Sequence, residues 1–286
     1  MDDHDWLAER FEEHRAHLRA VAYRMLGSLS EADDAVQEAW LRLSRSETGG
    51  VENLGGWLTT VVARVSLDML RTRTSRREEP LDAVGSRPIA SGEGWADPEH
   101  EAILAESVGL ALLVVLQTLA PAERLAFVLH DMFAVSFDEI AAIVGRSPAA
   151  ARQLASRARR RVQGAARVPG AELASQRAVV SAFLAALRGG DLDALLAVLD
   201  PDLVVRADAK EIRGARVWAT QAMAFSRAIR FAQPALVNGA VGVVVAPRGR
   251  LFRVLNISIA GGKIAAIEVV TDPARLRGLD LAVLDG

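Results

Sequence analysis

The sequence has no cysteine, and this absence limits the chemistry open to the protein. Disulfide bonds, thiol nucleophiles and zinc sites built on cysteine are all excluded. The only tyrosine is Tyr23, and all five histidines lie at or before His130. Residues 131–286 therefore lack the usual partners for acid–base catalysis by a carboxylate. We assign no catalytic residue, no metal site and no cofactor.

Long apolar runs are also missing, since none approaches the roughly 20 residues that span a bilayer. The N-terminal residues MDDHDW are acidic and polar, unlike a signal peptide. We therefore expect a soluble, cytoplasmic protein that makes no membrane contact. Its net charge of −2 gives no overall attraction to nucleic acid, so DNA binding has to come from local basic patches. The 286 residues leave room for about two or three domains.

The most informative stretch is SFDEIAAIVGRSPAAARQLASRARRR, residues 136–161. Ser136 and Glu139 have the spacing of a capping box at the start of a short helix. Gly145 can end that helix with a positive φ angle. Ser147 then caps a second helix. Two short helices around a tight turn predict a helix-turn-helix whose second helix enters the major groove.

The second helix of this motif has two different faces. Its predicted apolar stripe consists of Ala151, Leu154, Ala155, Ala158 and Val162. Arg152 and Gln153, one turn into the helix, carry the donors and acceptors that read base edges. Ser156 is a further DNA-binding candidate on the same face. The arginines farther along suit phosphate contacts, and they are Arg157, Arg159, Arg160 and Arg161. The alternative is a solvated helix whose terminal arginines only complement the helix dipole.

The N-terminal part reads as three helices. The first spans residues 5–26, and the second begins at a cap formed by Ser30. Carboxylates cluster on the second helix, and the residues alone leave an acidic docking surface and a solvated face equally open. The third helix runs to about residue 77 and gathers a second candidate phosphate-binding patch. Its members are Arg64, Arg71, Arg73, Arg76 and Arg77.

Three blocks of this sequence resemble the extracytoplasmic-function sigma factors. The blocks are DDAVQEAWLRL, GWLTTVVARVSLDMLR and LAPAERLAFVLHDMFAVSFDEIAAIVGRSPAAARQLASRARRR. The resemblance implies that core RNA polymerase and promoter DNA are partners, with Asp33, Asp34 and Glu38 as polymerase contacts. It also implies that the third helix and the loop before it melt the −10 promoter element, and that the helix-turn-helix reads the −35 element.

Residues 172–286 have a mixed pattern of helices and strands, unlike the helical residues before them. Two helices, the second capped by Asp191, precede the strand DLVVRAD and a helix that contains Trp218. The segments ALVNGAVGVVVA, LFRVLNISIA and KIAAIEVV follow, separated by the turns PRGR and GG. Helices followed by a meander predict a curved sheet wrapped over helices. This pattern resembles a SnoaL-like cone domain, and sigma factors with such an extension form a group, the SigJ type.

The expected architecture is therefore multidomain: two all-α sigma domains and a C-terminal α+β SnoaL-like cone domain. The predicted parts are a sigma-2-like domain at 1–77, a flexible linker at 78–98, a sigma-4-like domain at 99–163, a hinge at 164–171 and a regulatory domain at 172–286. In the regulatory domain, the candidate pocket for a small-molecule ligand consists of Asp208, Lys210, Trp218, Arg253, Asn256 and Glu268.

The predicted function is a sigma factor that selects promoters and is modulated by its own C-terminal domain. The leucine-rich tail DPARLRGLDLAVL is the candidate contact, although it could equally pack on its own sheet. One alternative is a ligand-sensing helix-turn-helix regulator. The other is a cyclase- or isomerase-like enzyme with a DNA-binding arm.

Overall fold

The computed structural model describes residues 3–45, 53–76, 109–164, 169–207, 210–223, 229–247 and 250–284. Its contacts divide the chain into two compact units, each made of two segments. Met1–Trp95 and Leu119–Arg160 form the first unit, and Ala96–Thr118 and Arg161–Gly286 form the second. The predicted linker lies outside the described residues.

The first unit begins with three helices, α1 (Asp3–Leu26), α2 (Leu29–Leu43) and α3 (Leu54–Arg76), which pack against one another. Gly27 ends α1 with a φ of 72° and donates its N–H to the carbonyl of Tyr23. The cap of α2 is Ser28 and not the predicted Ser30. Ser28 has the extended backbone of an N-cap, and its side chain accepts from the N–H of Glu31.

The same unit contains α6 (Pro121–Phe127), the π-helical turn η1 (Val128–Met132), α7 (Phe137–Val144) and most of α8 (Pro148–Gln163). The capping box of Ser136 and Glu139 is present, and Gly145 has a φ of 69°. The Oγ of Ser147 accepts from the N–H of Ala150 at 3.2 Å. All five residues of the predicted apolar stripe of α8 are buried. These observations confirm the helix-turn-helix.

Helix α3 packs against both α6 and α7. Arg124 of α6 is 5% exposed, and its guanidinium donates to the carbonyl of Met25 at 2.8 Å. Arg64 of α3 donates to the carbonyl of Ala142 in α7 at 3.4 Å. The N-terminal helices and the helix-turn-helix therefore share one packed unit.

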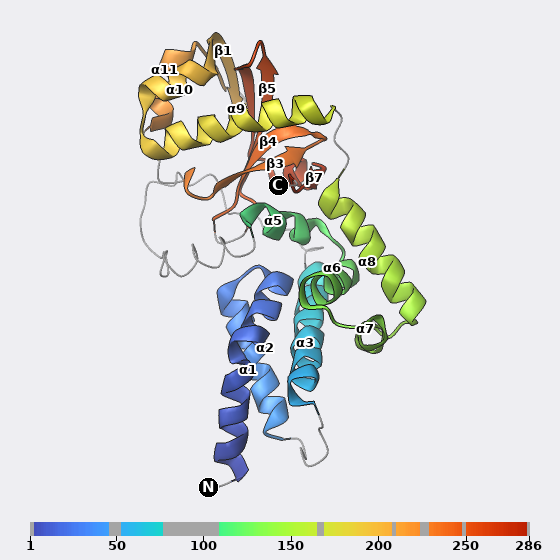
Figure 1. Cartoon of the computed structure of the whole chain (residues 1–286). Coiled ribbons are helices and arrows are strands. Elements are labelled where there is room, and N and C mark those ends of the chain that lie inside the picture. The colour runs from blue at the N-terminus through green and yellow to red at the C-terminus, as the bar shows by residue number, and fades with distance from the viewer. Residues whose placement is uncertain are drawn as a thin grey trace. The chain divides into compact units, whose positions relative to one another are not determined.

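The second unit is a seven-stranded sheet with helices, drawn in yellow to red in Figure 1 apart from the green α5. Its helices are α5 (Leu110–Thr118), α9 (Gly170–Gly189), α10 (Leu192–Val198), α11 (Ala215–Met223) and α13 (Pro273–Arg277). Its strands are β1 (Leu199–Ala207), β2 (Lys210–Arg213), β3 (Ala232–Val237), β4 (Ala240–Val245), β5 (Arg253–Ala260), β6 (Lys263–Val270) and β7 (Leu281–Ala282). As predicted, the side chain of Asp191 caps α10.

The strand order is β2-β1-β6-β5-β4-β3-β7. Strands β3 to β6 form the predicted antiparallel meander, whereas β1 pairs with β6 in parallel. Helix α9 contacts β3 and β4, and α11 contacts β1 (Figure 1). The segment 235–246 is not continuous: Asn238 and Gly239, with φ angles of 51° and 82°, make a two-residue turn between β3 and β4. The observed elements confirm the α+β class of the C-terminal part.

Helix α5 precedes the helix-turn-helix in sequence but packs against β3 and β7 of the sheet. Strand β7 continues the sheet beyond β3, and Val283 directly after it donates its N–H to the carbonyl of Val162 at 2.9 Å. Gly164 also lies against Ala282. Helix α5 and the end of α8, which the sequence assigned to the sigma-4-like domain, thus belong to the second unit, and the predicted domain boundaries stay a prediction.

Candidate DNA and polymerase interface

The exposed face of α8 carries all of its candidate DNA-binding residues. Every one of them is exposed: Arg152, Gln153, Ser156, Arg157, Arg159, Arg160 and Arg161. The helical periodicity of the sequence predicted this face, because it depends only on residue spacing. The face carries five arginines and no acidic residue, so it can bind a phosphate backbone.

The arginines of this face differ in how the rest of the unit holds them. Arg159 forms an ion pair with Asp131 of η1, with 2.7 Å between its guanidinium nitrogen and the carboxylate. Arg152 lies over the ring of Phe137, 5.4 Å from the ring centroid. Neither Asp131 nor Phe137 was predicted to belong to the interface, although Phe137 directly follows the cap of α7.

The predicted arginine patch of α3 is divided in the structure. Arg64 and Arg71 are exposed and lie seven residues apart, on one side of the helix. Arg73 points the other way, toward α2, where it pairs with Glu31 and donates to the carbonyl of Leu26. The side chain of Arg76 and the whole of Arg77 lie outside the described residues. Arg73 is thus held in helix packing, and Arg64 and Arg71 remain the described candidates for DNA contact.

The three predicted polymerase contacts of α2 also point in different directions. Asp33 pairs with Arg19 of α1 at 2.6 Å, and Glu38 pairs with Arg42 at 3.0 Å. Asp34 is exposed and has no ion pair or hydrogen bond within the described residues. Of the three carboxylates, it is therefore the one that no described intramolecular partner engages.

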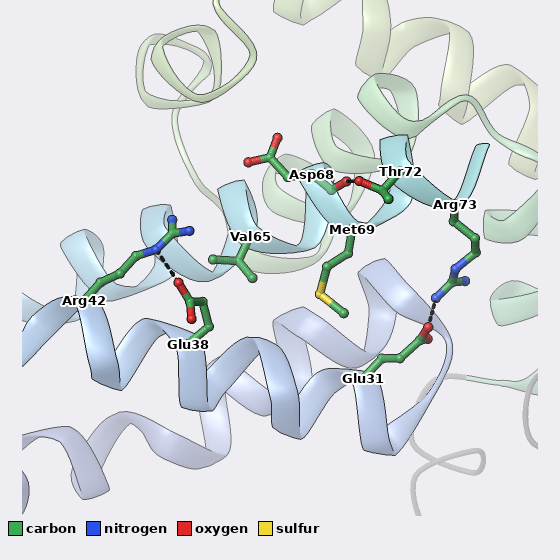
Figure 2. A pocket seen from close by; sticks show the side chains of 8 residues that line it. All are labelled: Glu31, Glu38, Arg42, Val65, Asp68, Met69, Thr72 and Arg73. Atoms are coloured by element: carbon green, nitrogen blue, oxygen red, sulfur yellow. Dashed lines mark hydrogen bonds and ion pairs between the residues drawn. The ribbon is translucent and has the colours of Figure 1, made fainter. Parts of the chain in front are cut away.

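Glu38 also lines a groove of about 460 Å³ between α2 and α3 (Figure 2). Figure 2 shows the ion pairs Glu38–Arg42 and Glu31–Arg73 near its two ends, with Met69 reaching from α3 toward α2 between them. The lining is Glu31, Glu38, Arg42, Val65, Asp68, Met69, Thr72 and Arg73. Val65 and Met69 are the apolar members of this lining, and the others are polar or charged, with both signs present.

The candidate pocket residues of the C-terminal part do not form one cluster of contacts. Asn256 of β5 donates to Glu268 of β6 at 3.0 Å, and both are half-buried. Trp218 instead stacks on Phe183 of α9 with 5.8 Å between ring centroids. Lys210 is exposed and Arg253 is half-buried. Asp208 lies outside the described residues.

Glu268 is poorly suited to act as a general base. Hydrogen bonds from Arg275 and Asn256 to its carboxylate lower the pKa of Glu268 below its ordinary value. A lower pKa weakens the carboxylate as a proton acceptor. Both carboxylate oxygens already accept hydrogen bonds, so the residue serves to join β5, β6 and α13.

Among the residues that the structure describes, no cluster of three or more histidine or acidic side chains could hold a metal ion. None of the described helices is long and apolar enough to cross a bilayer.

Comparison with known families gives two matches that cover the helical parts of the chain. Sigma-70 region 2 matches residues 10–76, and Sigma-70, region 4 matches residues 109–162. A probable ECF RNA polymerase sigma factor SigI of Mycobacterium tuberculosis is 38% identical over 282 residues, which cover 96% of this chain and 97% of SigI. The chain belongs to the ECF sigma factors.

Other relatives of this sigma factor are similar over the same length. SigJ of Mycobacterium tuberculosis is 37% identical, with 95% of this chain and 93% of SigJ covered. The crystal structure of SigJ covers 95% of this chain and 98% of its own, at 33% identity and a TM-score of 0.46. The sequence similarity to SigI and SigJ therefore includes the C-terminal part as well as the sigma regions.

Membership of this family confirms the predicted function at the level of the whole protein. Sigma factors bind core RNA polymerase and promoter DNA and direct transcription initiation, and they are not enzymes. The two alternative functions, a sensor regulator of another kind and a cyclase-like enzyme, are therefore set aside.

Proposed function

We propose that this sigma factor docks on core polymerase through the acidic side of α2, captures the −10 element with α3 and reads the −35 element with α8. The observation that carries this proposal is the exposed face of α8, where seven polar residues stand opposite a fully buried apolar stripe. Arg152 and Gln153 in its first turns are the base-reading candidates. The arginines from Arg157 onward are the phosphate-binding candidates.

Reconstituted transcription tests this assignment of roles. Promoters are first defined by mapping RNA 5′ ends after overexpression of the protein. Core polymerase and the purified chain should then produce the mapped transcripts from those promoters, and neither component should do so alone. Substitutions in the −35 and −10 elements should each reduce the yield. Unchanged yield after replacement of the whole −35 element would remove the reading role of α8.

We also propose that the C-terminal domain regulates the sigma regions from within the same chain. Two observations support this role over catalysis: the engaged carboxylate of Glu268, and the hydrogen bond from Val283 to the last turn of α8. A small molecule bound at Lys210, Arg253, Asn256 or Trp218 is our candidate signal. A metabolite library screened by thermal shift on the full chain and on an Asn256→Ala variant tests for such a ligand.

A further inference from the structure

The aromatic ring beneath Arg152 is held in place by a second ring. Phe137, the first residue of α7, is half-buried, and its centroid lies 3.8 Å from that of His130 at an interplanar angle of 31°. The Nδ1 atom of His130 in turn lies 3.0 Å from the carbonyl oxygen of Val135. This places His130, Phe137 and Arg152 in one line of contacts that runs from the π-helical turn to the first turns of α8.

Arg152 differs in this respect from its neighbours on the same face. Gln153 and Arg157 are exposed and have no hydrogen bond, ion pair or ring contact within the described residues. A free arginine side chain loses rotamer entropy when a base fixes it, which weakens binding. An arginine already held over a ring loses less. The N–H groups at the edge of the guanidinium stay available for the paired acceptors of a guanine.

We infer that Phe137, supported by His130, is a positioning residue that holds Arg152 ready for base recognition. The inference rests on the proposed reading role of α8. Phe137 acts through Arg152 and touches no base itself. The base-pair preference of the sigma factor therefore depends on a residue of α7 as well as on α8.

Substitutions of Phe137 in the full chain, bound to core polymerase, test this inference. The probe is a mapped promoter fragment and a series in which each −35 base pair is changed in turn. Phe137→Leu should reduce discrimination at the same base pair as Arg152→Ala, by roughly two- to fivefold, the range of an exposed cation–π contact. Phe137→Tyr keeps the ring and should retain the wild-type profile. The double variant Phe137→Leu/Arg152→Ala should discriminate no worse than Arg152→Ala alone.

Phe133 offers a matched control, since it directly follows the π-helical turn that carries His130 and its ring also contacts an arginine. The guanidinium of Arg24 is 5.1 Å from its ring centroid, and Phe133 also contacts His17. Phe133→Leu should leave the base-pair profile unchanged. If it alters the profile as Phe137→Leu does, loss of any aromatic in this region suffices and the inference is wrong.

The outcomes separate the inference from the proposed function. If Arg152→Ala changes no base-pair preference, the reading role of Arg152 fails and the positioning role falls with it. If Arg152→Ala has an effect and Phe137→Leu has none, only the positioning role fails. Should Phe137→Leu prove poorly folded, the Cδ protons of Arg152 supply the test in the wild-type chain. They should show an upfield ring-current shift by NMR, and a random-coil shift would overturn the inference.

Discussion

At the scale of single residues, the arginines of α8 are chemically identical but physically different. Arg152 lies over a ring, Arg159 is paired with an acid, and Arg157 is free within the described residues. Periodicity predicted that all of them would be exposed. It could not predict their partners, because Asp131 and Phe137 approach α8 only through the tertiary fold.

Replacement of Arg152 and of Arg160 should have different effects on promoter recognition. Arg152→Ala should cost about 1–3 kcal/mol at one base pair and relax discrimination there. Arg160→Ala should weaken binding evenly across sequences and lower the salt slope by about 1. Holoenzyme affinities for a −35 substitution series at several salt concentrations measure both effects. Indistinguishable profiles would show that this division of the helix is wrong.

Asp131 should limit the affinity of α8 for DNA. Its carboxylate neutralises Arg159, and its side chain is only 20% exposed. Asp131→Asn should therefore raise the affinity for duplexes of any sequence and steepen the salt dependence, since one more cation meets a phosphate. Titration of the variant with promoter and random-sequence duplexes checks this expectation. Glu123→Gln, on α6, is the control for removal of an acid, and an equal gain there would contradict a specific role for Asp131.

At the scale of elements, the sequence predicted those whose signals are local. The capping box, the glycine turn and the apolar stripe made α7 and α8 predictable almost to the residue. The division of the α3 patch was not predictable, because the orientation of Arg73 depends on where α2 packs. The turn at Asn238 and Gly239 was missed although Asn-Gly is a strong hairpin signal. The surrounding valines and alanines masked it as one continuous strand.

Charge reversal on α2 should separate docking from folding. Asp34→Lys should sharply reduce association with core polymerase, because this exposed carboxylate is free to meet a basic partner. Its effect on stability should stay under about 0.5 kcal/mol, as is usual for exposed positions. Pull-down with core polymerase and thermal unfolding measure the two quantities. Glu9→Lys, an exposed acid on α1, is the control and should bind normally. Normal binding by both variants would remove Asp34 from the interface.

The ion pair between α13 and β6 should stabilise the C-terminal domain in a pH-dependent way. The pKa of Glu268 is lowered in the folded chain by Arg275 and Asn256. Its contribution is therefore present above the unfolded carboxyl pKa of about 4.3 and is lost as the pH falls through the folded pKa. Arg275→Ala should cost about 0.2–1 kcal/mol at pH 7, since the pair is exposed, and less at pH 3.

Urea unfolding at the two pH values measures this difference. Arg277→Ala is the matched control, because Arg277 lies in the same helix and donates to the carbonyl of Pro273 instead of to a carboxylate. Its effect should be the same at both pH values. An equal cost for Arg275→Ala at pH 7 and pH 3 would exclude the ionised Glu268 as the source of the stabilisation.

At the scale of the whole molecule, the C-terminal tail (residues 272–284) belongs to the same compact unit as α5 and the end of α8. Leu276 and Leu281 are buried in this unit, so they serve its own core, while Leu279 and Leu284 are half-buried. The tail reaches α8 instead through the backbone of Val283. Composition suggested the tail as a contact but could not identify a main-chain hydrogen bond.

Removal of this hydrogen bond should alter the activity without altering the choice of promoter. Val283→Pro lacks the N–H that donates to the carbonyl oxygen of Val162, whereas Val283→Ala keeps this N–H. The proline variant should change transcript yield from the mapped promoter, and the alanine variant should resemble wild type. Both should start transcription at the same nucleotide. Equal yields from all three proteins would show that this bond has no part in regulation.

The position of α5 bears on how promoter specificity could be exchanged between relatives. The region 4 match begins at residue 109, yet α5 packs on β3 and β7, and its Leu113 and Leu116 are buried. A chimaera joined at residue 109 would place a foreign helix on the native sheet. Joints after Thr118 and after Arg160 would instead move the reading helices while the sheet keeps its own α5. Functional recombinants between relatives should therefore be joined after Thr118 and after Arg160, and not at residue 109.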